Sequence, residues 1–374
     1  MQQEERLSLS EVFVTVDDPR QSGKVEHDLV ELLVVAVSAV LSGADTFVEI
    51  EEWATEKLPW LRQHLKLAHG IASHDTFARV FSLIDPEQFE AAFRRWVVSI
   101  LPVLDAQVVA IDGKTSRRSG KANSAPLHLV SAFAAGANLV LGQRAVAKKS
   151  NEKTAIPELL AVLSLQGCIV TLDAMGTQAN IAQAIRDRGA DYVLAVKDNQ
   201  PTLADAIRDF FVLFKQAPQH TPHTMSETVE KNHGRLEIRR CYAFDALQCL
   251  PRKEQWPDLA SFVVIESERS IQNKTSIEQR LYISSLPAQA ERIATAIRQH
   301  WSVENNLHWC MDVVFADDQM RARTDHAGHN MALLKQLALN LLRTDPTVRK
   351  GSLKTKRLIA ATSDTYRAAL LGLS

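Results

Sequence analysis

Three acidic residues, Asp112, Asp173 and Glu304, have sequence surroundings in which a site for phosphate chemistry could form. Each aspartate follows a short apolar run that predicts a buried strand, Val108–Ile111 in one case and Ile169–Leu172 in the other. Glu304 lies in a stretch without Gly or Pro that predicts one regular helix, on a mostly apolar face. Because a buried carboxylate is costly without a positive partner, we expect the three side chains to share cations.

Three carboxylates suit Mg²⁺, for which Mn²⁺ can substitute, and the expected number of ions is two. Two such ions about 4 Å apart could activate an attacking hydroxyl and stabilise the leaving oxygen of a phosphodiester. The three residues lie 61 and 131 positions apart, so only folding can unite them. An aspartate at a strand end is more often a turn or cap residue, and the spacing alone leaves that role open.

Other groups near Glu304 could also do chemistry. His300 and His308 share its face of the expected helix and could suggest zinc, but no His-Glu-x-x-His pattern is present, so packing or DNA contact is the favoured role. Trp301 and Trp309 are expected in the core, with base stacking as the weaker alternative.

The elements that must position these residues follow two patterns. Residues 1–100 read as a series of helices, and from about residue 104 strands alternate with helices. These patterns predict an α/β fold with a ribonuclease H-like mixed sheet and flanking helices over residues 104–345. We expect a mainly β insertion at about 200–290, before the helix of Glu304. Residues 346–374 are expected to be a basic C-terminal tail.

Charge is distributed unevenly along a chain whose net charge is only −1. Residues 1–60 hold 4 Lys or Arg and 13 Asp or Glu, whereas 112–153 hold 8 and 2, and 321–357 hold 9 and 2. The two basic segments follow Asp112 and the Glu304 helix, which suits a phosphate backbone, although solvated surface explains either segment alone. Their candidate DNA contacts are Lys114, Arg117, Arg118, Lys148, Lys149, Arg321 and Arg323. Lys197 and Arg235 are further candidates. A strand-to-helix turn explains Lys197 equally well, and a solvated strand face is the favoured explanation for Arg235.

Composition excludes several classes of protein. The 374 residues include four scattered cysteines with no Cys-x-x-Cys pair, which signals neither a disulfide framework nor a cysteine zinc site. The apolar run Leu29–Leu41 contains Glu31 and is too short to span a membrane. No secretory signal is recognisable at the N-terminus. We therefore expect a soluble, cytoplasmic protein with no membrane partner.

Several ordered motifs resemble those of the DDE transposases of bacterial insertion sequences, of the H-repeat-associated type. They are Ala110-Ile111-Asp112-Gly113-Lys114-Thr115, Leu172-Asp173-Ala174-Met175-Gly176, His300-Trp301-Ser302-Val303-Glu304-Asn305 and Asp312-Val313-Val314-Phe315-Ala316-Asp317-Asp318. The resemblance extends from about residue 8 to 345. It implies a bacterial protein with a helical transposase-associated domain before a ribonuclease H-like catalytic domain.

By this resemblance Asp112, Asp173 and Glu304 are the three catalytic acids and metal ligands. The implied partner is double-stranded DNA, namely the terminal inverted repeats of the element and the target, with the protein bound to the nucleoid as a plausible homodimer. One departure affects DNA contact: Ile297, His300 and Met311 occupy positions where related transposases often carry Tyr, Arg and Lys. The residues that could substitute for them are Arg298, His300, Asn305 and His308.

The predicted activity is metal-dependent cleavage at insertion-sequence ends followed by strand transfer into target DNA. One alternative is a metal-dependent nuclease of the same fold, which cuts without joining. The other is a degenerate or domesticated relative that binds DNA without cleaving it; the altered neighbours of Glu304 and the near-neutral net charge keep this alternative open.

Overall fold

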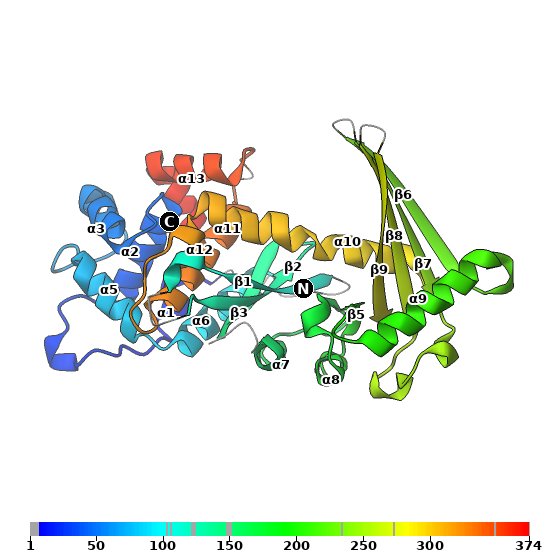
Figure 1. Ribbon diagram of the computed structural model, residues 1–374. Helices are drawn as coiled ribbons and strands as arrows, with labels where there is room; N and C mark the ends of the chain where they lie inside the picture. The colour runs from blue at the N-terminus through cyan, green and yellow to red at the C-terminus, as the bar shows by residue number, and fades with distance from the viewer. Residues whose placement is uncertain are drawn as a thin grey trace, which may run out of the picture.

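The computed structural model describes residues 7–101, 104, 107–120, 125–146, 152–232, 235–271, 274–347 and 349–373. Its centre is a mixed sheet with the strand order β3-β2-β1-β4-β5-β9-β8-β7-β6 (Figure 1). The strands are β1 (Val108–Thr115), β2 (His128–Ala134), β3 (Leu139–Val146), β4 (Ile169–Leu172), β5 (Asp191–Val196), β6 (Thr224–Asn232), β7 (Arg235–Phe244), β8 (Ser261–Ile271) and β9 (Lys274–Ser284).

The first five strands have the ribonuclease H-like arrangement, which confirms the expected fold. β1, β2 and β3 are antiparallel neighbours, and β4 and β5 run parallel to β1. Alternate residues of the central strands enter two different cores, as expected for strands covered on both faces. Val108 and Ile169 pack with Ile293 of one core, whereas Val109 and Val170 belong to the main core.

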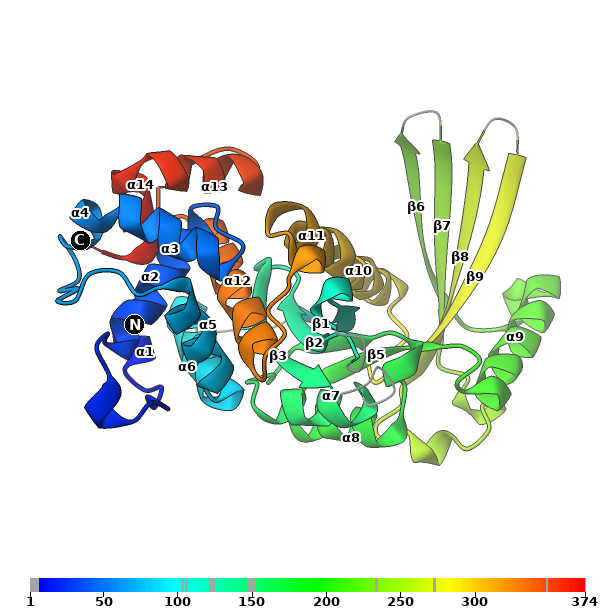
Figure 2. The same ribbon diagram turned by 60° about the vertical axis from the view of Figure 1, so that its left-hand side comes forward.

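Helices cover both faces of this sheet. α7 (Glu152–Ala161) and α8 (Ala179–Asp187) lie on one face, and α10 (Ala290–His300) crosses β1, β4 and β5 on the other (Figures 1 and 2). α10 continues over β6 and β7, so one helix spans the central strands and the insertion. The segment that carries Glu304 follows directly after this helix.

The insertion is α9 (Pro201–Gln216) followed by the β6–β9 blade, which projects from the rest of the molecule (Figure 2). The blade extends the central sheet, because β9 pairs antiparallel with β5. Val193 lies opposite Ser284 at one end of this pairing, and Val196 lies opposite Leu281 at the other. This agrees with the mainly β insertion that the sequence predicts. Strand β6 was not expected, because its residues, Thr-Met-Ser-Glu-Thr-Val-Glu-Lys-Asn, are mostly polar and it forms an edge of the sheet.

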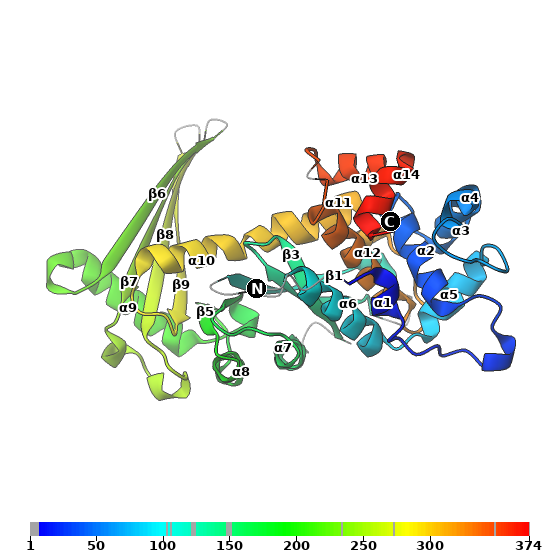
Figure 3. The same cartoon turned by 180° about the vertical axis from the view of Figure 1, so that it is seen from behind.

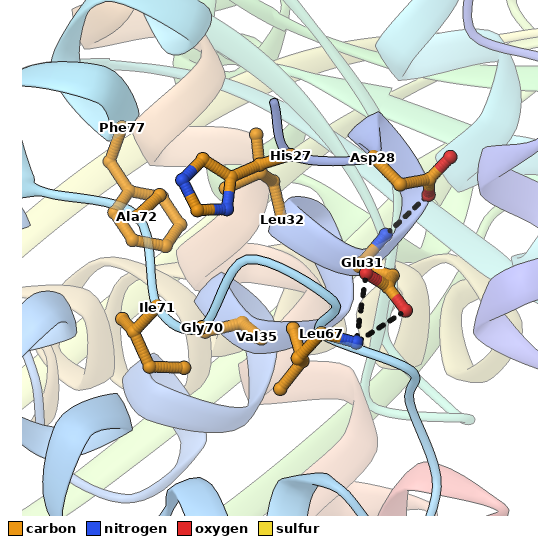
Figure 4. Close-up of a pocket in the computed structure, with 10 residues that line it drawn as sticks. All are labelled: His27, Asp28, Glu31, Leu32, Val35, Leu67, Gly70, Ile71, Ala72 and Phe77. Atoms are coloured by element: carbon orange, nitrogen blue, oxygen red, sulfur yellow. Dashed lines mark hydrogen bonds between the residues drawn. The ribbon is translucent and has the colours of Figure 1, made fainter. Parts of the chain in front are cut away.

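The N-terminal part is helical, with α2 (Leu29–Leu41) almost entirely buried at its centre. The helices around it are α1 (Leu9–Phe13), α3 (Phe47–Glu56), α4 (Leu58–Leu61), α5 (His74–Leu83) and α6 (Pro86–Ile100). Side-chain N-caps begin two of these helices, since Ser73 accepts from the Thr76 N–H and Asp85 accepts from the Glu87 N–H. Glu31 accepts from the Leu67 N–H and closes a small, mostly apolar hollow under α2 (Figure 4).

A late helix, α12 (Ala327–Arg343), joins the helical part to the sheet. Near its start, the Asn330 amide donates to the carbonyls of Phe81 and Ile84. Ten residues later, Asn340 both accepts from the Val140 N–H and donates to the Val140 carbonyl on β3. α12 also packs on α2, so the helical part is built from both ends of the chain.

The last described residues form α13 (Leu353–Thr362) and α14 (Asp364–Leu371), where the sequence predicts only a basic tail. Both helices pack on α2, as the view from behind shows (Figure 3). The buried Arg357 explains part of this packing, because its guanidinium donates to the Val40 and Ala44 carbonyls and pairs with Asp45 at 2.7 Å. Among the described helices, none is long and apolar enough to cross a membrane.

Candidate active site

Asp112 and Asp173 lie side by side at one end of the central strands. The last parallel pair of β1 and β4 is Ile111 with Leu172, so the aspartates are the next residue on each. β1 does not end at Ile111, as the sequence suggests, but continues to Thr115 because β2 pairs with it that far. Asp173 also caps the following turn, since its Oδ1 accepts from the Met175 N–H at 3.0 Å.

Glu304 lies in a helical segment that is not a regular α-helix. α10 ends at His300, residues Glu304–His308 form a π-helical turn, and α11 (Trp309–Val314) follows. The Trp309 N–H donates to the Glu304 carbonyl five residues earlier. The expected single regular helix is therefore wrong in one turn, and π-helical turns of this kind often occur at functional sites.

The fold brings the three acids into one pocket. Asp112, Asp173 and Glu304 line it together with Lys197 and Arg280, and its volume is about 210 Å³. Asp112 and Glu304 also form a tighter group with the buried His308, and the donor atoms of the three residues all lie within 4.8 Å of one another. The His308 Nδ1 is 3.5 Å from Glu304 Oε2 and 3.6 Å from Asp112 Oδ2.

The electrostatics of this group favour a bound cation. The pKa of Asp112 is raised to about 6, mainly by burial and also by the charges of Glu304 and Asp173, against the opposing effects of His308 and the Gly113 N–H. The contact with His308 lowers the pKa of Glu304, despite partial burial. Asp112 is thus a carboxylate whose protein partners do not offset its burial. Oxygen donors in this state fit a divalent cation.

His300 has a different setting from His308. Its Nδ1 is 2.9 Å from the Thr171 hydroxyl, and burial lowers the pKa of His300 to about 4. His300 lines the pocket of the three acids, but it is a neutral, hydrogen-bonded side chain at neutral pH rather than a cationic DNA contact.

Lys114 is engaged inside the protein and not presented to solvent. Its side chain is 14% exposed, and its Nζ lies 2.6 Å from Asp312 Oδ1 and 3.2 Å from Asp317 Oδ2. These ion pairs join β1 to α11 and the turn after it, and they leave Lys114 poorly placed to contact a DNA phosphate. Sequence reasoning missed this role, because nothing local links Lys114 to residues about two hundred positions later.

The other basic candidates fall into three groups. Arg117, Arg118, Arg321 and Arg323 are exposed, and the Arg323 guanidinium donates to the Arg118 carbonyl at 2.8 Å. Lys197 and Asn305 are also exposed, next to the acids, whereas Arg298 pairs with Glu230 and Arg235 pairs with Glu237. Lys148 and Lys149 lie outside the described residues.

A groove of about 940 Å³ leads away from Glu304 between the β6–β9 blade and α10. Trp301 lines it and is 45% exposed, and Trp309 is 58% exposed, so the expectation that both lie in the core is wrong. The π-helical turn and the end of α10 turn these rings outward. Arg280 of β9, which the sequence did not single out, lies with its guanidinium carbon 4.1 Å from the Trp301 ring centroid.

Comparison with known proteins agrees with this architecture. A family model described as the transposase DDE domain matches residues 103–341, and one described as DDE_Tnp_1-associated matches residues 10–97. Protein YbfL of Escherichia coli (strain K12) is 40% identical over 375 residues, 98% of each chain. The H repeat-associated protein YhhI of the same strain, named as a candidate transposase, is 39% identical over 98% of each chain.

A shorter relative from that strain, named inactive transposase YbfQ, is 38% identical over 21% of this chain and 93% of its own length. Among solved structures, the piggyBac transposase synaptic complex with hairpin DNA matches with a TM-score of 0.42 and 10% identity, over 99% of this chain and 78% of the other.

Proposed function

Because this chain belongs to the DDE family of DNA transposases, we propose that it cleaves DNA at the ends of an insertion sequence and transfers the released strand into target DNA. Water attacks a phosphodiester at the element end and frees a 3′ hydroxyl. That hydroxyl then attacks a phosphodiester of the target, so each step breaks one P–O bond and forms another. The observation that carries the proposal is the convergence of Asp112, Asp173 and Glu304 in one pocket.

We propose that Asp112, Asp173 and Glu304 would hold divalent cations, Mg²⁺ or Mn²⁺, and that two such ions would bind. Such ions, when bound, activate the attacking hydroxyl and stabilise the charge of the leaving oxygen. The raised pKa of Asp112 supports this role, because a positive charge beside it would offset its burial. Asp173 is already oriented by the backbone N–H of Met175.

The DNA would run past this pocket in contact with basic surface on two sides. The groove beside Glu304 carries Arg280 and Arg298, and Lys197 is exposed at the pocket. Arg117, Arg118, Arg321 and Arg323 would bind phosphates near the end of β1, where they are exposed. Since two element ends must be joined to one target, a homodimer on DNA at the nucleoid suits the proposed reaction.

The direct test is incubation of the full-length protein with labelled DNA that carries the element's own ends, in Mg²⁺ or Mn²⁺. Cleaved and joined products are expected from the wild type and from Asp209→Asn, an exposed carboxylate on α9. Both products should be lost in Asp173→Asn. Cleavage without joining would instead identify a nuclease, and tight end binding without cleavage in either metal would identify a DNA-binding relative.

A further inference from the structure

His308 is a buried side chain that faces the two carboxylates of the proposed site. It is 7% exposed, and its Nδ1 lies 3.5 Å from Glu304 Oε2 and 3.6 Å from Asp112 Oδ2. Both distances are longer than a strong charge-assisted hydrogen bond, which is about 2.7–2.9 Å. The three donor atoms therefore surround a point without closing on one another, which is the arrangement of ligands around an ion.

The other nitrogen of His308 has no protein partner that would hold the ring in a purely structural role. Its Nε2 is buried and has no hydrogen-bond partner in the part of the chain that the structure describes. A histidine that serves packing alone usually satisfies its buried nitrogen, as His300 does with Thr171. Without a cation, the neighbouring carboxylates favour a proton on Nδ1. A cation between the three donor atoms would favour the tautomer with the proton on Nε2 and would take the lone pair of Nδ1.

The backbone explains why His308 faces the acids. Glu304 and His308 are the first and last residues of the π-helical turn, which is wider than an α-turn. Leu307 and Cys310 of the same segment are buried in the main core, which holds the turn against the sheet. The direction of the imidazole is thus set by the fold and not by a flexible surface loop.

We propose that His308 is a metal ligand, which with Asp112 and Glu304 forms a cation site of two oxygens and one nitrogen. This inference rests on the proposed function, since it takes Asp112 and Glu304 as ligands. Mg²⁺ binds oxygen donors, whereas imidazole suits transition metals such as Mn²⁺ and Zn²⁺ better. The protein should therefore bind Mn²⁺ more tightly than Mg²⁺, and the preference should depend on His308.

The test is pulsed electron paramagnetic resonance of Mn²⁺ bound to the full-length protein, purified without a histidine tag. A directly bound imidazole nitrogen modulates the Mn²⁺ spin echo. We expect this nitrogen modulation in the wild type. We also expect it in His300→Gln, the matched control, because His300 lines the pocket of the three acids but is not a proposed ligand. His308→Gln should lose the modulation and bind Mn²⁺ at least about tenfold more weakly by titration calorimetry, with little change for Mg²⁺.

The failures of the two proposals can be told apart. Mn²⁺ that binds the wild type without nitrogen modulation, and is lost in Asp112→Asn, would overturn the role of His308 and leave the carboxylate site intact. Absence of Mn²⁺ binding to the wild type would overturn both. The wild-type spectrum decides the first point by itself, so the test does not depend on the folding of His308→Gln, which circular dichroism would check.

Discussion

The most informative single residue is Asp112, because its ionised side chain lowers the stability of the folded protein when no cation is bound. Its position on β1 is buried next to two other acids, and burial raises its pKa to about 6. A group that serves stability alone would not be expected in such a position. Strain of this kind is typical of active sites, where function opposes stability.

We predict that Asp112→Asn stabilises the metal-free protein and that the gain grows with pH. The folded protein holds the Asp112 proton more tightly than the unfolded chain does, so ionisation costs stability as the pH rises from about 4 to about 6. Below that window the two proteins should differ little, and above it Asp112→Asn should be more stable by about 2–3 kcal/mol. Urea unfolding with a chelator at pH 4, 5, 6 and 7 measures this.

Addition of Mn²⁺ at pH 7 is the internal control, because it should stabilise the wild type and not Asp112→Asn. A difference between the two proteins that stays constant from pH 4 to pH 7 would contradict the assignment of the raised pKa to Asp112.

At the scale of elements, the ion pairs of Lys114 join β1, on one side of the pocket, to α11 and the turn after it, on the other. Lys114 lies two residues after Asp112 on β1, and its partner Asp312 lies on α11, directly after the π-helical turn. The second partner, Asp317, is 3% exposed. The network therefore fixes the distance between β1, which carries Asp112, and α11, which follows the turn of Glu304.

We predict that Lys114→Met destabilises the protein by about 3 kcal/mol, because it leaves two carboxylates near each other and partly buried without a cation. The matched control is Arg117→Met, which removes a contact to Asp318 from a side chain that is 84% exposed and should cost less than about 1 kcal/mol. Urea unfolding at pH 7 compares the two variants. Equal losses of unfolding free energy in the two variants would show that the ion pairs of Lys114 do not hold β1 and α11 together.

The sequence predicts regular elements well and irregular ones poorly. Apolar runs identified β1 and β4 and the aspartate that follows each run, because burial on both faces demands such runs. Strand β6 was missed because its residues are polar. The π-helical turn was missed because a 3.6-residue pattern assumes a regular helix, and the outward direction of Trp301 and Trp309 follows from that turn.

Long-range pairing was equally invisible in the sequence. Nothing local shows that Asn340 would bond Val140 or that Lys114 would reach Asp317. The three acids could be named because their motifs resemble those of a known family, whereas the sequence could not distinguish His308 from His300 until the distances to Asp112 and Glu304 were known. Spacing gives candidates, and the fold selects among them.

At the scale of the whole molecule, charge is polarised along the chain. The acidic first 60 residues form much of the helical part, while the exposed arginines 117, 118, 321 and 323 cluster near the end of β1. We predict that Arg117→Ala and Arg321→Ala each weaken DNA binding. Each should also reduce the slope of log binding constant against log salt concentration by about one unit.

Fluorescence anisotropy with duplex DNA at 50–200 mM salt, within the range where phosphate contacts dominate, measures this slope. Arg188→Ala, an exposed arginine directly after α8, is the control that should leave it unchanged. An equal effect from all three variants would point to general charge rather than to a defined DNA path.

The C-terminal helices contribute to the same molecule-wide structure through Arg357. We predict that Arg357→Ala lowers stability by about 3 kcal/mol, since its buried guanidinium satisfies the Val40 and Ala44 carbonyls and pairs with Asp45. Leu358→Ala on the same helix, with a side chain 65% exposed, should change stability by less than about 0.5 kcal/mol. Thermal unfolding and protease cleavage within α2 would report both effects.

The packing of α13 on α2 also has a consequence for synthesis. More than 300 residues separate the end of α2 from the start of α13, so at about 5–20 residues per second α2 waits about 15–60 s for α13 to be synthesised. During that interval an apolar surface emerges from the ribosome before the chain that covers it exists. Messages cut short before codon 353 would yield a polypeptide with that surface permanently open, a natural substrate for chaperones and proteases.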